Sequence, residues 1–430
     1  MASPKSIRQF FVWVSKAIGI LQYLSLALLA IYYAYPIWFG VFSSFGFGPR
    51  ELNSSFTIMG VADPQIEGNH KVEANGFLKG TVDVLGNDLY LRHLVQTNKF
   101  WGKPDAMVLL GDLVSFQNLD VNEFKNRAER LKRITGAADF NSTGVVKEAT
   151  PQVNEIPVWA IPGNHDIGYG NELSDSQTEK WISSFGLMNW ATKTSVAGHP
   201  VRILGINSLA LDNVQFNPEV ASKFQSCNSL SCSGILPLSK EAVDVWTFLY
   251  EQAAQAEIPT IIFTHVPFYK PQHACVDKPF ISRSDNHRVL KQNHLSYETT
   301  QHIFHLLPSI ALILSGHDHM GCDYHHPNGV IEHTLPSVMG YFGGNIGFVE
   351  LTLRNVPSMF RRNLQSKFHH YLSYLPSPVK NYVYSETKAF GPFLDMTFTR
   401  TFAGPSFIWW ALHISTCVLT ILRLLLISFV

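Results

Sequence analysis

The stretch Ile156–Asp166, IPVWAIPGNHD, is the part of the sequence that decides the fold. Its apolar residues are rich in β-branched and aromatic side chains and predict a buried strand, which ends at Pro162-Gly163. Asn164, His165 and Asp166 follow at once. The tight loop at the carboxyl end of this strand therefore displays an amide, an imidazole and a carboxylate.

Other apolar runs along the chain end in the same way. They are Thr57–Ala62 before Asp63 and Gln65, Ala106–Leu110 before Gly111-Asp112, Thr260–Thr264 before His265, and Ala311–Ser315 before Gly316, His317, Asp318 and His319. Open α/β sheets bind ligands outside the carboxyl ends of their strands. We therefore expect these polar side chains to meet at one edge of an α/β sheet.

The predicted set of side chains is rich in oxygen and nitrogen and contains no thiolate. Such a set suits Mn²⁺, Fe²⁺ or Zn²⁺ rather than an iron–sulfur cluster. It also offers more ligands than a single ion needs. Two ions bridged by a shared carboxylate would use all of them.

The polar elements stand in a specific order. The pattern D-x-H, G-D, G-N-H-D/E, a lone His and G-H-x-H is matched from Asp63 to His319, with Gln65 in place of the first histidine. Each element alone is weak, but the ordered series is specific. In these motifs the chain resembles the calcineurin-like metallophosphoesterases. The resemblance implies an α/β fold of the α+β sandwich type over residues 56–355, with four layers in which central β-sheets are flanked by helices.

The resemblance also implies a role for each site residue. Asp112 would bridge two divalent metal ions. One ion would be completed by Asp63, Gln65 and His319, and the other by Asn164, His265 and His317. His165 would contact the phosphate and protonate or steady the leaving oxygen, and Asp166 would orient His165. For His265 the alternative is a hydrogen-bonded histidine of the core.

Two departures from the family pattern bear on the metal and the substrate. Gln65 supplies an amide oxygen, a harder donor than imidazole, and so favours Mn²⁺ over Zn²⁺. Leu113 follows the bridging Asp112 in place of a further carboxylate, which leaves the surroundings of Asp112 open. Asp-x-Gln together with the stretches 163–169, 316–319 and 339–345 resembles the eukaryotic membrane-anchored branch of the family. The resemblance implies removal of ethanolamine phosphate from a mannose of glycosylphosphatidylinositol (GPI) anchors, which supports transport from endoplasmic reticulum to Golgi.

Both ends of the chain are apolar. No charged residue occurs between Ala17 and Gly48, a run longer than a signal-peptide core, and this predicts a cytosolic tail and first transmembrane helix over residues 1–48. A second transmembrane helix is expected over residues 405–425, with Arg423 reaching toward a headgroup. For this second segment an interfacial or buried helix is the alternative. Lys+Arg and Asp+Glu number 33 each, so nothing favours a nucleic-acid partner.

The remaining features concern the part between the spans. The sequons at Asn53 and Asn141 and the basic N-terminus favour a lumenal catalytic domain in the membrane of the endoplasmic reticulum or early secretory pathway. Residues 356–404 are expected to form a lumenal linker of unknown role. Four cysteines allow three disulfide pairings, with Cys227–Cys232 as the local candidate, or remain free thiols. The residues Val84, Leu85, Leu89, Leu91 and Leu94 predict the apolar face of a helix.

Two other functions stay open at this stage. One keeps the metal ions and changes the substrate from the GPI glycan, or a protein that carries it, to another lipid headgroup or a phosphoprotein. The other is a membrane cargo receptor that keeps the fold and lacks catalysis. The intact set of ligands argues against the receptor, because a binding module has no need of every ligand.

Overall fold

The computed structural model describes residues 4–34, 55–140, 156–217, 229–255, 257–353, 384–390 and 393–427. Within these residues two six-stranded sheets, with strand orders β15-β16-β14-β1-β2-β3 and β12-β13-β11-β8-β5-β4, form the centre of the molecule. The sequons at Asn53 and Asn141 and the residue Cys227 lie outside the described residues, so the predictions that involve them stay predictions.

In the first sheet the strands β1 (Ser55–Val61), β2 (Ala106–Leu109) and β3 (Val158–Ala160) are parallel. On the other side of β1 lie the antiparallel strands β14 (Asn345–Leu353), β16 (Leu394–Phe402) and β15 (Tyr384–Phe390). The expected linker over 356–404 is therefore wrong for residues 384–390 and 394–402, which extend the sheet.

The second sheet has a parallel centre and antiparallel edges. Its central strands are β5 (His199–Ile206), β8 (Thr260–Thr264), β11 (Ile310–Ser315) and β13 (Ile331–Thr334), and its edges are β4 (Trp190–Val196) and β12 (Cys322–His325). Two small hairpins lie apart from it: β6 (Val214–Phe216) with β7 (Ile235–Pro237), and β9 (Ile281–Arg283) with β10 (Val289–Gln292).

The two sheets pack face to face because alternate residues of each strand are apolar on both sides. Ile58, Val108 and Leu314 belong to the core between the sheets, whereas Met59 and Leu109 belong to the core on the helical side. Trp159 of β3 and Trp190 of β4 stack across the sandwich with ring centroids 5.3 Å apart. The predicted four-layer arrangement of sheets flanked by helices is confirmed.

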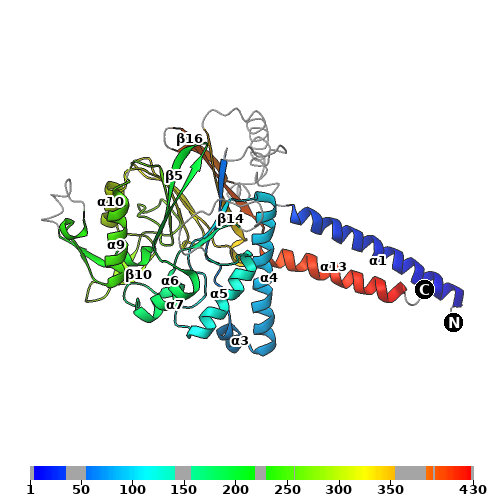
Figure 1. Cartoon of the computed structure of the whole chain (residues 1–430). Helices are drawn as coiled ribbons and strands as arrows, with labels where there is room; N and C mark the ends of the chain where they lie inside the picture. Colours follow the sequence, from blue (N-terminus) through cyan, green and yellow to red (C-terminus); the bar gives the residue numbers. More distant parts are fainter. Residues whose placement is uncertain are drawn as a thin grey trace.

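Helices cover the outer face of each sheet. Figure 1 shows α4 (Phe77–Gly102) and α5 (Val121–Thr135) on one side, and α9 (Lys240–Ala253) and α10 (Tyr297–Leu306) on the other. The shorter helices are α3 (Asn69–Asn75), α6 (Asn164–Ile167) and α7 (Asp175–Phe185). The start of α5 is fixed by Asp120, whose carboxylate accepts hydrogen bonds from the first backbone amides of the helix, and its end by Gly136 in the left-handed conformation.

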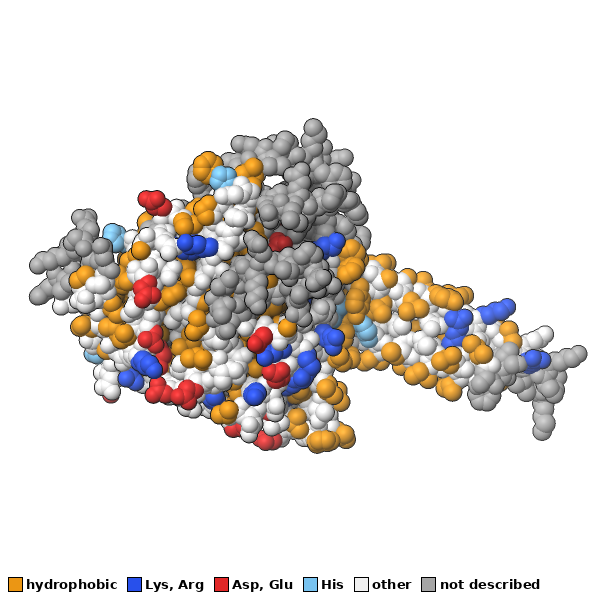
Figure 2. All heavy atoms as spheres, viewed as in Figure 1, with side chains coloured by type: hydrophobic (Ala, Val, Ile, Leu, Met, Phe, Trp, Pro, Cys, Tyr) orange, Lys and Arg blue, Asp and Glu red, His pale blue; other side chains and the backbone are white. Residues whose placement is uncertain are grey.

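The terminal helices α1 (Pro4–Tyr33) and α13 (Ser406–Ile427) project together from the domain (Figure 1), and the exposed surface of the pair is largely hydrophobic (Figure 2). Both are long and apolar enough to cross a membrane. The first helix begins well before the predicted span and includes Lys16. Arg423 was expected to reach a lipid headgroup, but its guanidinium group donates a hydrogen bond to the side-chain oxygen of Gln22 on α1 at 2.8 Å.

Candidate metal centre

The carboxyl ends of β1, β2, β3, β8 and β11 lie at one edge of the sandwich and bring the predicted ligands together. Two clusters form there, one of Asp112, His265 and His317, the other of Asp63, Asp112 and His319. Within each cluster the potential ligand atoms lie within 4.8 Å of one another. Asp112 belongs to both clusters, which is the arrangement that a bridging carboxylate requires.

The two amides of the predicted set join one cluster each. The Asn164 Oδ1 atom lies 3.1 Å from the His265 Nε2 atom. The Gln65 Nε2 atom lies 3.4 Å from both the Asp112 Oδ2 atom and the His319 Nε2 atom. A 180° rotation of the Gln65 amide would present its oxygen there instead. All seven predicted ligands are therefore in one place.

The turns that carry these side chains are strained. Asp63, Gln65, Asp112 and His317 have φ angles of 53°, 42°, 50° and 72°. Residues with a Cβ atom rarely adopt this left-handed region, and each instance costs about 1–3 kcal/mol. Four such residues in one set of predicted ligands indicate that the fold holds these side chains in place against the preference of the backbone. Strain concentrated in this way is typical of functional sites.

Backbone carbonyl groups select the tautomers of two histidines. The His265 Nδ1 atom lies 2.8 Å from the carbonyl oxygen of Leu110, and the His317 Nε2 atom lies 2.9 Å from that of Gln292. A carbonyl oxygen only accepts, so each of these nitrogens carries a hydrogen. The remaining nitrogens, His265 Nε2 and His317 Nδ1, face each other at 3.2 Å. Metal-binding histidines are oriented by their second nitrogen in the same way.

The electrostatics of the site require positive charge. Asp63 and Asp112 are almost completely buried. Burial raises the pKa of Asp63 well above its usual range, whereas the adjacent His265 keeps the pKa of Asp112 low in spite of burial. Although burial opposes the imidazolium form, Asp112 and Asp63 raise the pKa of His265 to about 9. The positive charge can come from a proton on His265 or from a cation bound among these side chains. Carboxylate, amide and imidazole groups together are suitable ligands for a divalent metal ion.

Asp166 lies differently from the prediction, because its carboxylate binds backbone amides where a contact with the His165 ring was expected. The His165 ring is 39% exposed, and its Nδ1 atom donates to the carbonyl oxygen of Ser115 at 3.1 Å. The buried carboxylate of Asp166 accepts from the backbone amides of Val114 at 2.9 Å and Gly163 at 2.8 Å. Asp166 therefore joins two site loops through their backbones, and Ser115 occupies the position against His165 that was expected for Asp166. The sequence carries no signal for Ser115, since every residue has a carbonyl group.

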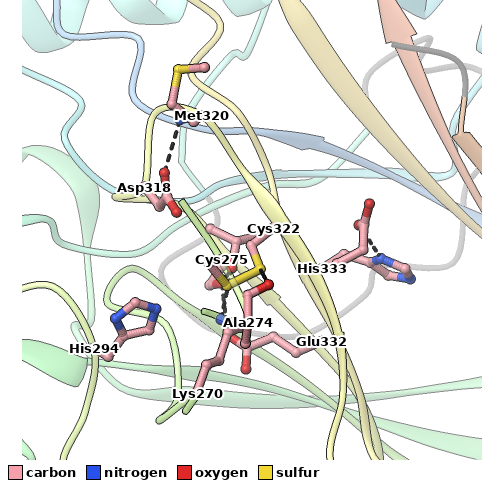
Figure 3. Close-up of a disulfide and its surroundings, with 12 residues drawn as sticks. Lys270, Ala274, Cys275, His294, Asp318, Met320, Cys322, Glu332 and His333 are labelled. Carbon is pink, nitrogen blue, oxygen red and sulfur yellow. Dashed lines mark hydrogen bonds and ion pairs between the residues drawn. A yellow bond between two sulfur atoms is a disulfide. The ribbon is translucent and has the colours of Figure 1, made fainter. Parts of the chain in front are cut away.

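Further residues support the site from behind. The Tyr169 hydroxyl donates to the Gln292 carbonyl oxygen at 3.2 Å, the same oxygen that holds His317. A disulfide between Cys275 and Cys322 ties the segment after β8 to the strand that follows His319. Figure 3 shows this disulfide among Lys270, Asp318 and Glu332. Lys270 and Glu332 form a completely buried ion pair at 2.8 Å.

A groove of about 510 Å³ leads from the site toward the terminal helices. Gln65 lines one part of it, and Ser406 and Phe407, the first residues of α13, line another. Its other walls come from α4 and from the short helix η5 (Gly340–Phe342), whose Phe342 ring lies 4.8 Å from the ring of His319. The site therefore opens beside the helices that could cross a membrane.

Comparison with known proteins gives matches over most of the chain. The family model described as calcineurin-like phosphoesterase matches residues 56–321. The uncharacterized protein C23A1.02c of Schizosaccharomyces pombe is 56% identical over 97% of this chain and 97% of its own length. Protein TED1 of Saccharomyces cerevisiae is 25% identical, covering 68% of this chain and 73% of its own, and metallophosphoesterase 1 of Cricetulus griseus is 24% identical, covering 62% and 63%. A crystal structure of a dimetal phosphatase from Danio rerio aligns with a TM-score of 0.37 at 15% identity, covering 69% of this chain and 94% of its own.

Proposed function

Because the chain belongs to the calcineurin-like phosphoesterase family, we propose that it is a membrane-attached phosphodiesterase whose site holds two divalent metal ions. The observation that carries the proposal is the pair of ligand clusters that share Asp112. Asp63, Gln65 and His319 would hold one ion with Asp112. The other ion would be held by Asn164, His265 and His317. The potential ligand atoms of these residues, Asn164 Oδ1, His265 Nε2 and His317 Nδ1, already lie close together.

The metal ions would supply charge neutralisation for the phosphoryl oxygens and activation of the attacking water. The amide of Gln65, a hard and neutral donor, favours Mn²⁺ in the site that it completes. The chain itself fixes the ligands, through the carbonyl groups of Leu110 and Gln292 and through the strained turns at Asp63 and Asp112.

His165 is the group that we assign to the leaving oxygen. Its Nδ1 atom is committed to the Ser115 carbonyl, so its Nε2 atom faces the site, 3.8 Å from the Asp112 Oδ2 atom. A protonated Nε2 can donate a hydrogen bond to the phosphate and then its proton to the departing alkoxide. The backbone amide of His165 donates to Asp112 at 2.8 Å, so the acid and the shared carboxylate are positioned by the same turn.

The groove indicates the class of substrate. It runs from Gln65 to Ser406 and Phe407 at the start of α13, so a phosphodiester attached to a membrane lipid could reach the site without leaving the bilayer. The resemblance to the membrane-anchored branch extends the proposal to ethanolamine phosphate on a mannose of GPI anchors, in the lumen of the endoplasmic reticulum. Another lipid headgroup is the second candidate, and the same groove supports it.

Two substitutions in the full-length protein test the proposed chemistry. Asp112→Asn removes the charge shared by both clusters, and His317→Ala removes one ligand. Each should reduce Mn²⁺-dependent hydrolysis of an aryl phosphodiester by far more than the ~10–100-fold typical of residues that only support a ligand. His305→Ala, at an exposed position of α10, serves as the control. Activity of the Asp112 variant within tenfold of the unmodified protein, at equal metal content, would refute the assignment.

The substrate needs a separate measurement. Mass spectrometry of GPI glycans from cells without the gene should show retained ethanolamine phosphate. Expression of the unmodified protein should remove it, and expression of the Asp112→Asn variant should not. A normal glycan profile in the deficient cells would leave another lipid headgroup as the substrate.

A further inference from the structure

Helix α4 has an apolar face that the domain does not bury. Leu78, Val82, Leu85 and Leu89 are 80%, 66%, 56% and 50% exposed. Their spacing of four, three and four residues places them in one row along the helix. Phe77, at the start of the helix, is 76% exposed beside this row. We call Phe77, Leu78, Val82, Leu85 and Leu89 the outer face of α4.

The opposite face of α4 is apolar as well. Leu91, Leu94 and Val95 are almost completely buried and belong to the core against the first sheet. A surface helix of a soluble protein is apolar on one side and polar on the other, whereas a helix that is apolar on two sides is covered on both. The sheet covers the inner side of α4, so the outer face requires a second apolar environment.

The ends of the two spans lie directly against α4. His93 stacks with Tyr32 at the end of α1 and with Trp409 near the start of α13, each at 5.6 Å between ring centroids. Trp410 packs closely against Gly86, where an added Cβ atom would lie 3.1 Å from its ring. Tyr and Trp residues at span ends mark the boundary between membrane and water. Because α4 contacts these rings, it lies at the depth of that boundary.

The orientation of α4 agrees with such a position. Figure 1 shows α4 running crosswise to α1 and α13 at the end where they join the domain, so that the helix would lie along the bilayer surface. Figure 2 shows hydrophobic side chains at the free end of α4, on the side toward which the spans project. The free end of α4 and the spans therefore present hydrophobic side chains on the same side of the domain.

We propose that α4 lies in the interface of the membrane that α1 and α13 span, with its outer face in contact with lipid. Helices of this kind bury their apolar face about 5–10 Å into the boundary between headgroups and acyl chains. The contact would fix the tilt of the catalytic domain, because α4 adds a lateral support of about 39 Å, at 1.5 Å per residue, to the two spans. It would also place the mouth of the groove, where Tyr341 is 90% and Phe407 68% exposed, at the bilayer surface.

The test measures the position of α4 in the full-length protein in phosphatidylcholine vesicles. Leu85→Cys is labelled with a small fluorophore in a Cys417→Ser background, because Cys417 is the free thiol among the described residues. Quenching by lipids that carry a spin label in the upper acyl chain is then compared with a control. The control is Val243→Cys on α9, which is 43% exposed on the opposite side of the sheets. Leu78→Cys provides a second labelled site if the variant at position 85 folds poorly.

We expect quenching at position 85 to exceed that at position 243 by about threefold or more, as for a side chain inserted below the headgroups. Equal quenching at the two positions overturns the proposal. A second copy of the chain is the competing occupant of the outer face. Efficient cross-linking between position 85 of two copies, without quenching by lipid, would assign the face to that copy and equally overturn it. The measurement involves no hydrolysis, so its outcome does not depend on the proposed function.

Discussion

Replacing Glu332 by Gln should destabilise the catalytic domain by about 3 kcal/mol, because the change leaves the Lys270 ammonium buried beside a neutral partner. Glu332 on β13 is completely buried. Its Oε1 atom accepts from Lys270 Nζ at 2.8 Å and from Ser315 Oγ at 3.1 Å, and its Oε2 atom from His326 Nε2 at 2.9 Å. Lys270 follows His265 on the same segment, and Ser315 precedes His317. The pair therefore joins the two loops that supply these ligands.

The magnitude follows from the acidity of Glu332. Burial alone would raise its pKa, but Lys270 and then His326 hold the pKa down to about 2, from an ordinary value of 4.5. At about 1.4 kcal/mol for each pH unit, this difference corresponds to about 3 kcal/mol of stability. Removing one partner of a buried ion pair costs about 3–5 kcal/mol in other proteins, which agrees. Since the pKa is lower in the folded state, this stability is present above about pH 4.5 and is lost as the pH falls toward 2.

The assay is thermal unfolding of the full-length protein in detergent, followed by tryptophan fluorescence. A loss of about 3 kcal/mol should lower the Tm by about 6–12 °C in a domain of a few hundred residues. The control is the double variant Lys270→Met with Glu332→Gln, which removes both charges and should recover more than half of the loss. The difference in Tm between the unmodified and Glu332→Gln proteins should stay constant from pH 7 to about 5 and shrink at lower pH. A double variant no more stable than the single one, or a difference independent of pH, would refute the reasoning.

The remaining predictions concern the site and the topology. Gly163→Ala should reduce hydrolysis by more than about 100-fold and lower the metal content of the purified protein. The reason is that the added Cβ atom would overlap the backbone nitrogen and the carboxylate of Asp112. Full activity of this variant would show that the loop of Gly163 can move away from the loop of Asp112 without loss of function. Asn141→Gln should increase the electrophoretic mobility of the protein by removing a glycan, because we expect Lys5, Arg8 and Lys16 to hold the N-terminus in the cytosol and thereby the catalytic domain in the lumen. Unchanged mobility, together with protease access to the domain in intact vesicles, would contradict this topology.

The sequence predicted which side chains meet at one edge of the sheets, because the information for this clustering is local. A strand that ends in Gly-Asp or Gly-Asn-His carries its own turn and its own side chain, and parallel strands bring such ends to one edge. The roles of Leu110 and Gln292 could not be predicted in this way. Both act through a carbonyl oxygen, which every residue possesses, so only the folded structure shows that they orient His265 and His317. Ser115 beside His165 is a third case.

Pairing between distant strands was equally hidden. The strand Leu394–Phe402 adds to the sheet through backbone hydrogen bonds with β14, more than forty residues earlier in the chain. The pairing partner of a strand depends on the hydrophobic pattern of the whole sheet, so it cannot be predicted from the sequence of that strand alone. The residues 384–402 therefore resembled a linker between the domain and the second span. As part of the sheet they connect that span directly to the centre of the fold, so β16 and α13 follow one another with only Ala403–Pro405 between them.

The case of α4 shows a different limit. Val84, Leu85, Leu89, Leu91 and Leu94 predicted one apolar face, but Leu91 and Leu94 are buried while Leu85 and Leu89 are exposed. The periodicity of apolar residues in a helix indicates which side chains avoid water. It does not distinguish a protein core from a lipid bilayer, because both exclude water. Distinguishing them requires the position of the helix relative to the spans, which only the fold supplies. A helix that buries one face in the protein and presents a second apolar face beside a span therefore deserves a test for lipid contact in any membrane-attached enzyme.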